Sequence, residues 1–105
     1  MATRCTIKIE GIDYAKVYKH WDGYPDATLK WLKEFNQDFY NERGDDAEYK
    51  FAQLLRSSSR DAEKFGLDAS LHTGWGVVPF NIGCWEEFEY ILQKDGSVTY
   101  QEMEL

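Results

Sequence analysis

The chain has 105 residues, 43% hydrophobic and 30% charged, enough to bury a core as one domain over residues 1–105 without disulfides or metal. Its 19 acidic and 12 basic residues give a net charge of -7, so neither nucleic acid nor an anionic membrane surface is expected as a partner. No segment has the apolar length of a signal peptide or membrane span, and we expect a cytoplasmic protein. Cys5 and Cys84 lie far apart among apolar residues, which favours buried, reduced thiols; a disulfide would require neighbouring strands.

Residues 4–21 alternate in polarity around the turn sequence EGID, which predicts an antiparallel hairpin. One face would carry Cys5, Ile7, Ile9, Ala15, Val17 and Trp21. The other face would be polar and partly aromatic, with Lys8, Tyr14, Lys16, Tyr18 and His20.

Two helices are expected next. The first begins at Pro25, has apolar residues at helical spacing and ends at Gly44. The second begins after Asp45 or Asp46, with apolar positions at Ala47, Phe51, Leu54, Leu55, Ala62 and Phe65. Three consecutive serines at residues 57–59 predict a break or restart in its middle, because serine hydroxyls compete for backbone hydrogen bonds.

Residues 67–83 are rich in glycine and proline and predict a long ordered loop or an irregular strand. Residues 84–93 and 98–105 then predict a second hairpin with Asp95 and Gly96 at its tip. The expected fold class is α+β. Its four-stranded, mostly antiparallel sheet would follow the order hairpin, two helices, hairpin, with both helices on one face.

The sheet face without helices would expose apolar area from both hairpins. Its contributors are Tyr14, Tyr18, His20, Trp85 and Ile91. Such a patch predicts self-association, and a homodimer is therefore one expected partner state.

The motif HWDGYP, residues 20–25, resembles the signature of a small family of uncharacterised microbial and phage proteins. This resemblance implies a strand that leads through the motif into a helix, and it implies no reaction. The residues themselves suit a structural corner: Asp22 can cap the helix, Gly23 can adopt a positive φ, and Pro25 fits the first helical turn. Only His20 and Tyr24 are left without a structural role.

Further candidate residues lie outside this motif. His20 and His72 could form a proton-transfer pair or metal site with Asp22, although their spacing matches no metal motif. A Cys84 nucleophile lacks an activating neighbour in the sequence, so an inert thiol is the stronger interpretation. Trp75, between two glycines, either lines an aromatic recess with Trp21 and Trp85 or closes over the core.

We therefore expect a non-enzymatic binding or interaction module with an aromatic-lined surface near the HWDGYP corner. Its unknown partner would be a protein or a small molecule, and no cofactor or metal is expected. The candidate binding residues are His20, Asp22, Tyr24, His72, Trp75 and Trp85. The alternative is a small hydrolase-like or metal-dependent enzyme that uses His20, Asp22 and His72.

Overall fold

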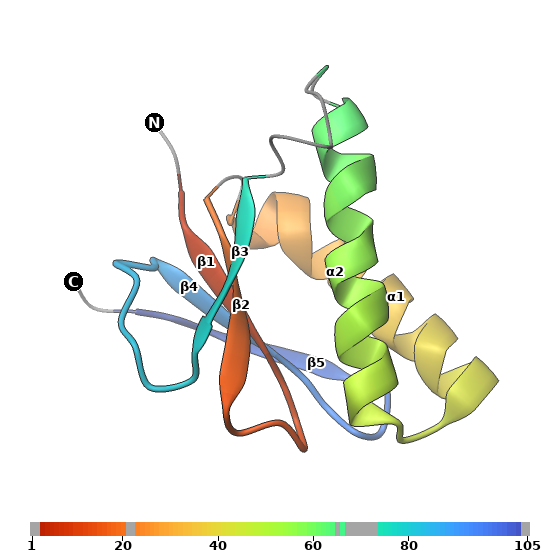
Figure 1. The fold of residues 1–105 in the computed structure, drawn as a ribbon. Helices are drawn as coiled ribbons and strands as arrows, with labels where there is room; N and C mark the ends of the chain where they lie inside the picture. Colours follow the sequence, from red (N-terminus) through yellow and green to blue (C-terminus); the bar gives the residue numbers. More distant parts are fainter. Residues whose placement is uncertain (1–2, 21–22, 65, 67–73, 104–105) are drawn as a thin grey trace.

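A computed structural model describes residues 3–20, 23–64, 66 and 74–103 (Figure 1). Within these ranges the chain forms, in order, β1 (Cys5–Ile9), β2 (Ala15–Lys19), α1 (Pro25–Arg43), α2 (Ala47–Lys64), β3 (Trp75–Pro79), β4 (Phe88–Leu92) and β5 (Val98–Glu102). In this part of the chain, no helix is long and apolar enough to cross a membrane.

The strands form one five-stranded sheet in the order β3-β2-β1-β4-β5. All neighbouring pairs are antiparallel except β1 and β4, which are parallel. The expected four-stranded, mostly antiparallel sheet is therefore wrong. The additional strand, β3, lies in the segment predicted to be a loop or irregular strand. It has only five residues, too few to show an alternating pattern in the sequence.

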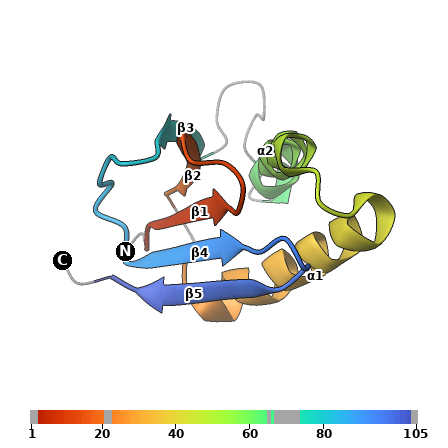
Figure 2. The ribbon, with the colours of Figure 1, turned by 90° about the horizontal axis from the view of Figure 1, so that it is seen from below.

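The parallel pair follows from the path of the chain. The connection from β3 to β4 starts at one edge of the sheet and passes β2 and β1 before β4 joins the far side of β1 (Figure 2). Such a crossover places β4 alongside β1 in the same direction, whereas a hairpin would have made neighbouring strands antiparallel. Both helices belong to the connection between β2 and β3.

Both helices pack on the same face of the sheet, here called the inner face. Leu32 of α1 and Leu54 of α2 are fully buried in one core cluster with inner-face residues of the strands: Cys5, Ile7, Ile9, Val17, Phe88, Tyr90, Leu92 and Val98. This arrangement of the helices agrees with the expected one. The α1 helix also ends as predicted, at Gly44 with a φ of 66°.

The α2 helix runs through the three serines without interruption, so the expected break is wrong. The Ser57 hydroxyl donates to the carbonyl oxygen of Gln53, one turn earlier, at 3.3 Å. This bond satisfies the hydroxyl within the helix, where it does not compete with the backbone ladder.

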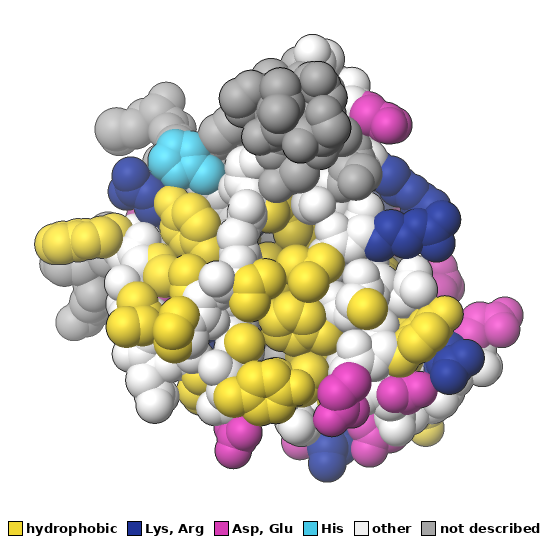
Figure 3. All heavy atoms as spheres, in the orientation of Figure 1, with side chains coloured by type: hydrophobic (Ala, Val, Ile, Leu, Met, Phe, Trp, Pro, Cys, Tyr) yellow, Lys and Arg dark blue, Asp and Glu magenta, His cyan; other side chains and the backbone are white. Residues whose placement is uncertain are grey.

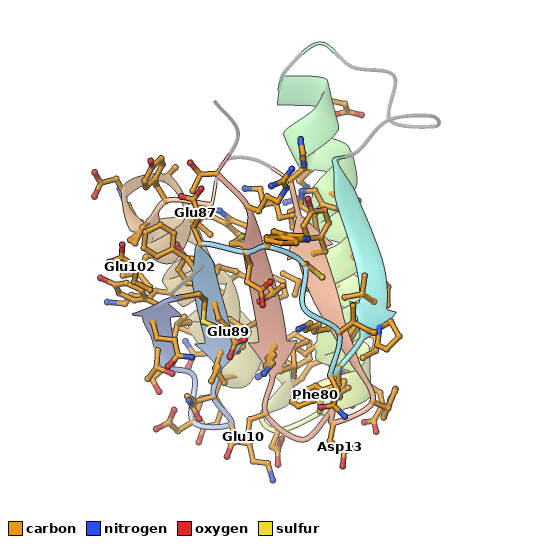
Figure 4. All side chains as sticks on the ribbon, turned by 90° about the vertical axis from the view of Figure 1, so that its left-hand side faces the viewer. Glu10, Asp13, Phe80, Glu87, Glu89 and Glu102 are labelled. Atoms are coloured by element: carbon orange, nitrogen blue, oxygen red, sulfur yellow. The ribbon has the colours of Figure 1, made fainter. Side chains whose placement is uncertain are left out.

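Residues 80–87, which connect β3 to β4, cross the opposite, outer face of the sheet over β1 and β2 (Figure 4). Glu86 Oε1 lies 3.9 Å from Lys16 Nζ, and both side chains are buried. Phe80 covers the ammonium group of Lys8, which lies 4.3 Å from the ring centroid. The chain itself therefore occupies part of the expected open face, while Tyr14 and Trp85 of the predicted patch are 65% and 75% exposed. Cys84 and Trp85, predicted to begin a strand, belong to this connection instead.

Candidate functional site

A groove of about 550 Å³ lies between α1, α2 and the start of β3. Its volume falls within the usual range for small-molecule sites. It begins at the first turn of α1, directly after the HWDGYP corner. The groove is lined by Asp26, Ala27, Lys30, Trp31, Glu34, Phe35, Asp38, Ser57, Arg60 and Trp75.

Two tryptophans from different elements meet in this groove. The rings of Trp31 and Trp75 have centroids 5.9 Å apart and planes inclined by 36°. The ammonium group of Lys19 lies 5.5 Å from the Trp31 ring and 5.8 Å from the Trp75 ring, within the range of cation–π attraction. Lys19 is buried at an inner-face position of β2, which places its ammonium group near both indoles.

The rim of the groove carries charges of both signs. Asp26, Glu34 and Asp38 follow one another at intervals of whole turns along α1, with Lys30 among them. Arg60 and Ser57 face them from α2. An aromatic floor between polar walls can hold a flat ring and orient its charged substituents.

The HWDGYP corner is fixed mainly by backbone contacts. The amide of Gly23 donates to the carbonyl oxygen of Thr3 at 2.8 Å, and a Cβ atom at Gly23 would lie only 2.7 Å from that oxygen. Glycine is therefore needed for close packing and not for a positive φ, because Gly23 does not have one. Tyr24 occupies the N-cap of α1 without a side-chain cap, and Pro25 follows as expected. Asp22, the predicted cap, lies outside the described residues.

His20 lies at the outer-face end of β2 in a chain of side-chain hydrogen bonds. Arg4 Nε donates to the Tyr18 hydroxyl oxygen at 3.0 Å, and that hydroxyl lies 2.9 Å from His20 Nδ1. The Tyr18 hydroxyl can donate to Nδ1 or accept from it, according to the tautomer of the imidazole. The backbone amide of His20 also donates to Gly74, at the start of β3.

The predicted site residues occupy several places. Tyr24 is half-exposed and packs against Phe88, with ring centroids 5.7 Å apart. Trp75 packs against the core beside Trp31 and also lines the groove. Trp85 is 75% exposed on the connection over the outer face, with a φ of 58°. His72 and Trp21, like Asp22, lie outside the described residues.

A second hollow, of about 530 Å³, opens on the outer face beside the turn between β1 and β2. Glu10, Asp13 and Phe80 lie around it (Figure 4). The Lys8 ammonium group at its base is bound to Glu89 at 3.2 Å as well as to the ring of Phe80. The one aromatic residue among the described residues that line this hollow is Phe80, which already contacts Lys8, whereas two tryptophans meet in the groove beside Trp31; the groove is therefore the better candidate.

The described residues offer little support for a nucleophilic cysteine or a metal site. Cys5 and Cys84 are free thiols, and Cys5 is buried on the inner face. Burial raises the pKa of the Cys84 thiol; Lys16 opposes this shift and Glu86 adds to it. A raised pKa disfavours the thiolate that a nucleophile requires. Among the described residues, no three side chains from His, Cys, Asp and Glu gather to bind a metal ion.

Sequence reasoning missed three important residues of the groove. Trp31 lies beside the predicted apolar stripe of α1, and a large aromatic residue next to such a stripe is the signal that could have identified it. Lys19 is a charged residue at a position that alternation assigns to the inner face. Arg60 carries no local signal, since it reaches the groove only through the packing of α2.

The comparisons with known proteins contribute no relative. No protein-family model matches the chain, and no match was found among curated proteins or solved structures.

Proposed function

We propose that the protein is a non-enzymatic binding module whose groove between α1 and α2 holds a small zwitterionic molecule with a flat aromatic ring. The observation that carries this proposal is the contact between Trp31 and Trp75 in the groove. Both indoles are only partly buried, so their remaining surface is available to a flat apolar ligand.

The charges on the two helices define the rest of the ligand. The carboxylates of Asp26, Glu34 and Asp38 favour an ammonium group near α1. Arg60 favours a carboxylate near α2, since a guanidinium group matches the geometry of a carboxylate. A ligand with both groups on one ring system would complement both walls. The two free thiols are compatible with a cytoplasmic location, which we include in the proposal.

Three indole probes test the ligand class by calorimetry: L-tryptophan, which is zwitterionic, tryptamine, which is cationic, and indole-3-acetate, which is anionic. We expect L-tryptophan to bind most tightly, with a dissociation constant of about 1 mM or lower. Trp75→Ala should weaken this binding at least about tenfold, which corresponds to the loss of an aromatic contact. Absence of binding by all three probes would overturn the proposal.

Trp85→Ala is the matched control, because it removes an indole from the connection over the outer face and not from the groove. This variant should bind the probe as the unaltered protein does. If Trp85→Ala abolishes binding and Trp75→Ala does not, the groove is the wrong site.

The alternative proposal is a small hydrolase-like or metal-dependent enzyme using His20, Asp22 and His72. The hydrogen bond between Tyr18 and His20 favours it in one respect, because a partner on Nδ1 fixes the orientation of the imidazole. Hydrolysis of p-nitrophenyl acetate, with and without added zinc, tests this alternative. Turnover that His20→Ala abolishes would support the enzyme, whereas an equal rate in both proteins would exclude this use of His20.

A further inference from the structure

The outer edge of β3 is the feature from which we infer a partner. His20 donates its amide to Gly74 at one end of the pairing between β2 and β3, and Phe80 donates its amide to Tyr14 at the other end. In an antiparallel ladder, backbone groups point alternately toward and away from the neighbouring strand. Counting from either end, the N–H and C=O groups of Val77 point away from β2 and out of the sheet.

This edge is apolar. β3 has the sequence WGVVP and contains no charged residue, and Val77 is 53% exposed. Two other exposed hydrophobic residues adjoin its end: Tyr14, 65% exposed, accepts from Phe80, and Ile82, 50% exposed, donates to Pro79. Figure 3 shows hydrophobic side chains gathered over β3 and toward α2, with most charged side chains nearer the rim of the view.

Proteins usually protect edge strands with charged residues, proline or irregular geometry. The opposite edge, β5, ends at the charged residue Glu102 and carries polar Thr99 and Gln101. On β3 the one such device is Pro79, which lacks an N–H donor and limits how far an added strand can pair. The central part of β3 is thus the less protected of the two sheet edges.

We propose that β3 pairs with β3 of a second copy of this chain, antiparallel, about a two-fold axis beside Val77. The two Val77 residues then exchange N–H···O=C hydrogen bonds, and their exposed side chains meet on the inner face of a continuous sheet. This antiparallel pairing places the Pro79 end of β3 in one copy beside the Trp75 end of β3 in the other copy.

A second copy suits this edge because the outward Val77 groups match their own two-fold image, and charge opposes association less here than elsewhere. Each chain has a net charge of -7, so two copies repel each other over most approaches. β3 is the edge strand without a charge, and two β3 strands can meet without opposing like charges. The groove lies between the helices and includes only Trp75 from β3, so this inference does not rest on the proposed ligand.

Sedimentation equilibrium over a wide range of protein concentration tests the proposal on the full chain. We expect a reversible dimer, and we expect Val77→Lys to raise its dissociation constant by at least about tenfold, because two added charges would face each other. Gln101→Lys, which adds the same charge to β5, should leave the dimer intact. A monomer at every concentration, or a dimer that Gln101→Lys alone disrupts, would overturn the proposal.

Amide hydrogen exchange on the unaltered protein gives an independent test that does not depend on whether Val77→Lys folds. The Val77 amide should exchange more slowly as the protein concentration rises, since dimerisation protects it. The outward-facing amide of Tyr100 in β5 is the internal control and should not change with concentration. A Val77 exchange rate that is independent of concentration while a dimer forms would place the interface elsewhere.

Discussion

The Tyr90 hydroxyl, fully buried in the core, donates a hydrogen bond of 2.6 Å to the carbonyl oxygen of Gly23. The bond joins the centre of β4 to the HWDGYP corner, 67 residues earlier in the chain. Together with the bond from the Gly23 amide to Thr3, it fixes the point at which β2 leads into α1. The described part of the corner is therefore primarily architectural, and it positions the groove that starts on the first turn of α1.

Tyr90→Phe should lower the free energy of unfolding by about 1–2 kcal/mol, because the Gly23 carbonyl loses its buried donor. Urea denaturation measures this change. Retention of full stability would mean that the carbonyl finds another donor, and the link between the corner and β4 would then not be energetically important.

Gly23→Ala should destabilise the fold by about 2–3 kcal/mol, since the new methyl group would meet the Thr3 oxygen at 2.7 Å and the Cys5 Cβ atom at 2.8 Å. Gly83→Ala is the matched control, because a methyl group there has no atom within 4 Å. Thermal unfolding of the two variants should differ clearly. Equal melting temperatures would contradict the close packing of the corner.

Asn36→Ala should lower the free energy of unfolding by about 2 kcal/mol. The buried Asn36 amide donates to the carbonyl oxygens of Gln93 and Ser97, at 3.0 and 2.8 Å, and so attaches α1 to the turn between β4 and β5. Asn41→Ala, which alters an exposed amide on the same helix, should change stability by less than about 0.5 kcal/mol. Similar urea midpoints for the two variants would contradict this role of Asn36.

Lys50→Met should stabilise the protein at neutral pH by about 1 kcal/mol, because Lys50 is only 1% exposed and its charge is costly to bury. Burial lowers the pKa of Lys50, opposed by the charges of Asp45, Glu10 and Asp95. With a lowered pKa in the folded state, folded protein releases the proton first, so stability rises with pH between the folded pKa and the ordinary lysine pKa. The variant lacks this rise, and its advantage in urea denaturation should shrink as the pH increases. An advantage that grows with pH would contradict the lowered pKa.

How far the sequence predicts the fold depends on whether an element carries its own signal. The α1 helix and the tip of the last hairpin do: Gly44 has a φ of 66°, and Gly96 has a φ of 94° beside an Asp95 side chain that accepts from Ser97. β3 does not, because a strand of five residues at a sheet edge is stabilised by its neighbour β2. The parallel pairing of β1 and β4 likewise depends on the path of the whole connection.

The candidate site was predictable to a similar extent. Its general character, an aromatic surface near the corner that includes Trp75, could be inferred from composition and position in the chain. The residues that contact Trp75 could not be inferred, since Trp31 and Lys19 reach it through the packing of α1 against the sheet. Trp85, predicted for the same surface, lies on the connection that covers the outer face.

The indole N–H signals of the protein report directly on whether a ligand binds between α1 and α2 against Trp31 and Trp75. The chain has 4 tryptophans, so each indole signal can be assigned by substitution and followed by NMR during a titration with unlabelled L-tryptophan. We predict that the Trp31 and Trp75 signals shift together along one saturable binding curve while the Trp85 signal stays unchanged. A titration in which the Trp31 and Trp75 signals do not move, or in which only Trp85 responds, would contradict the account.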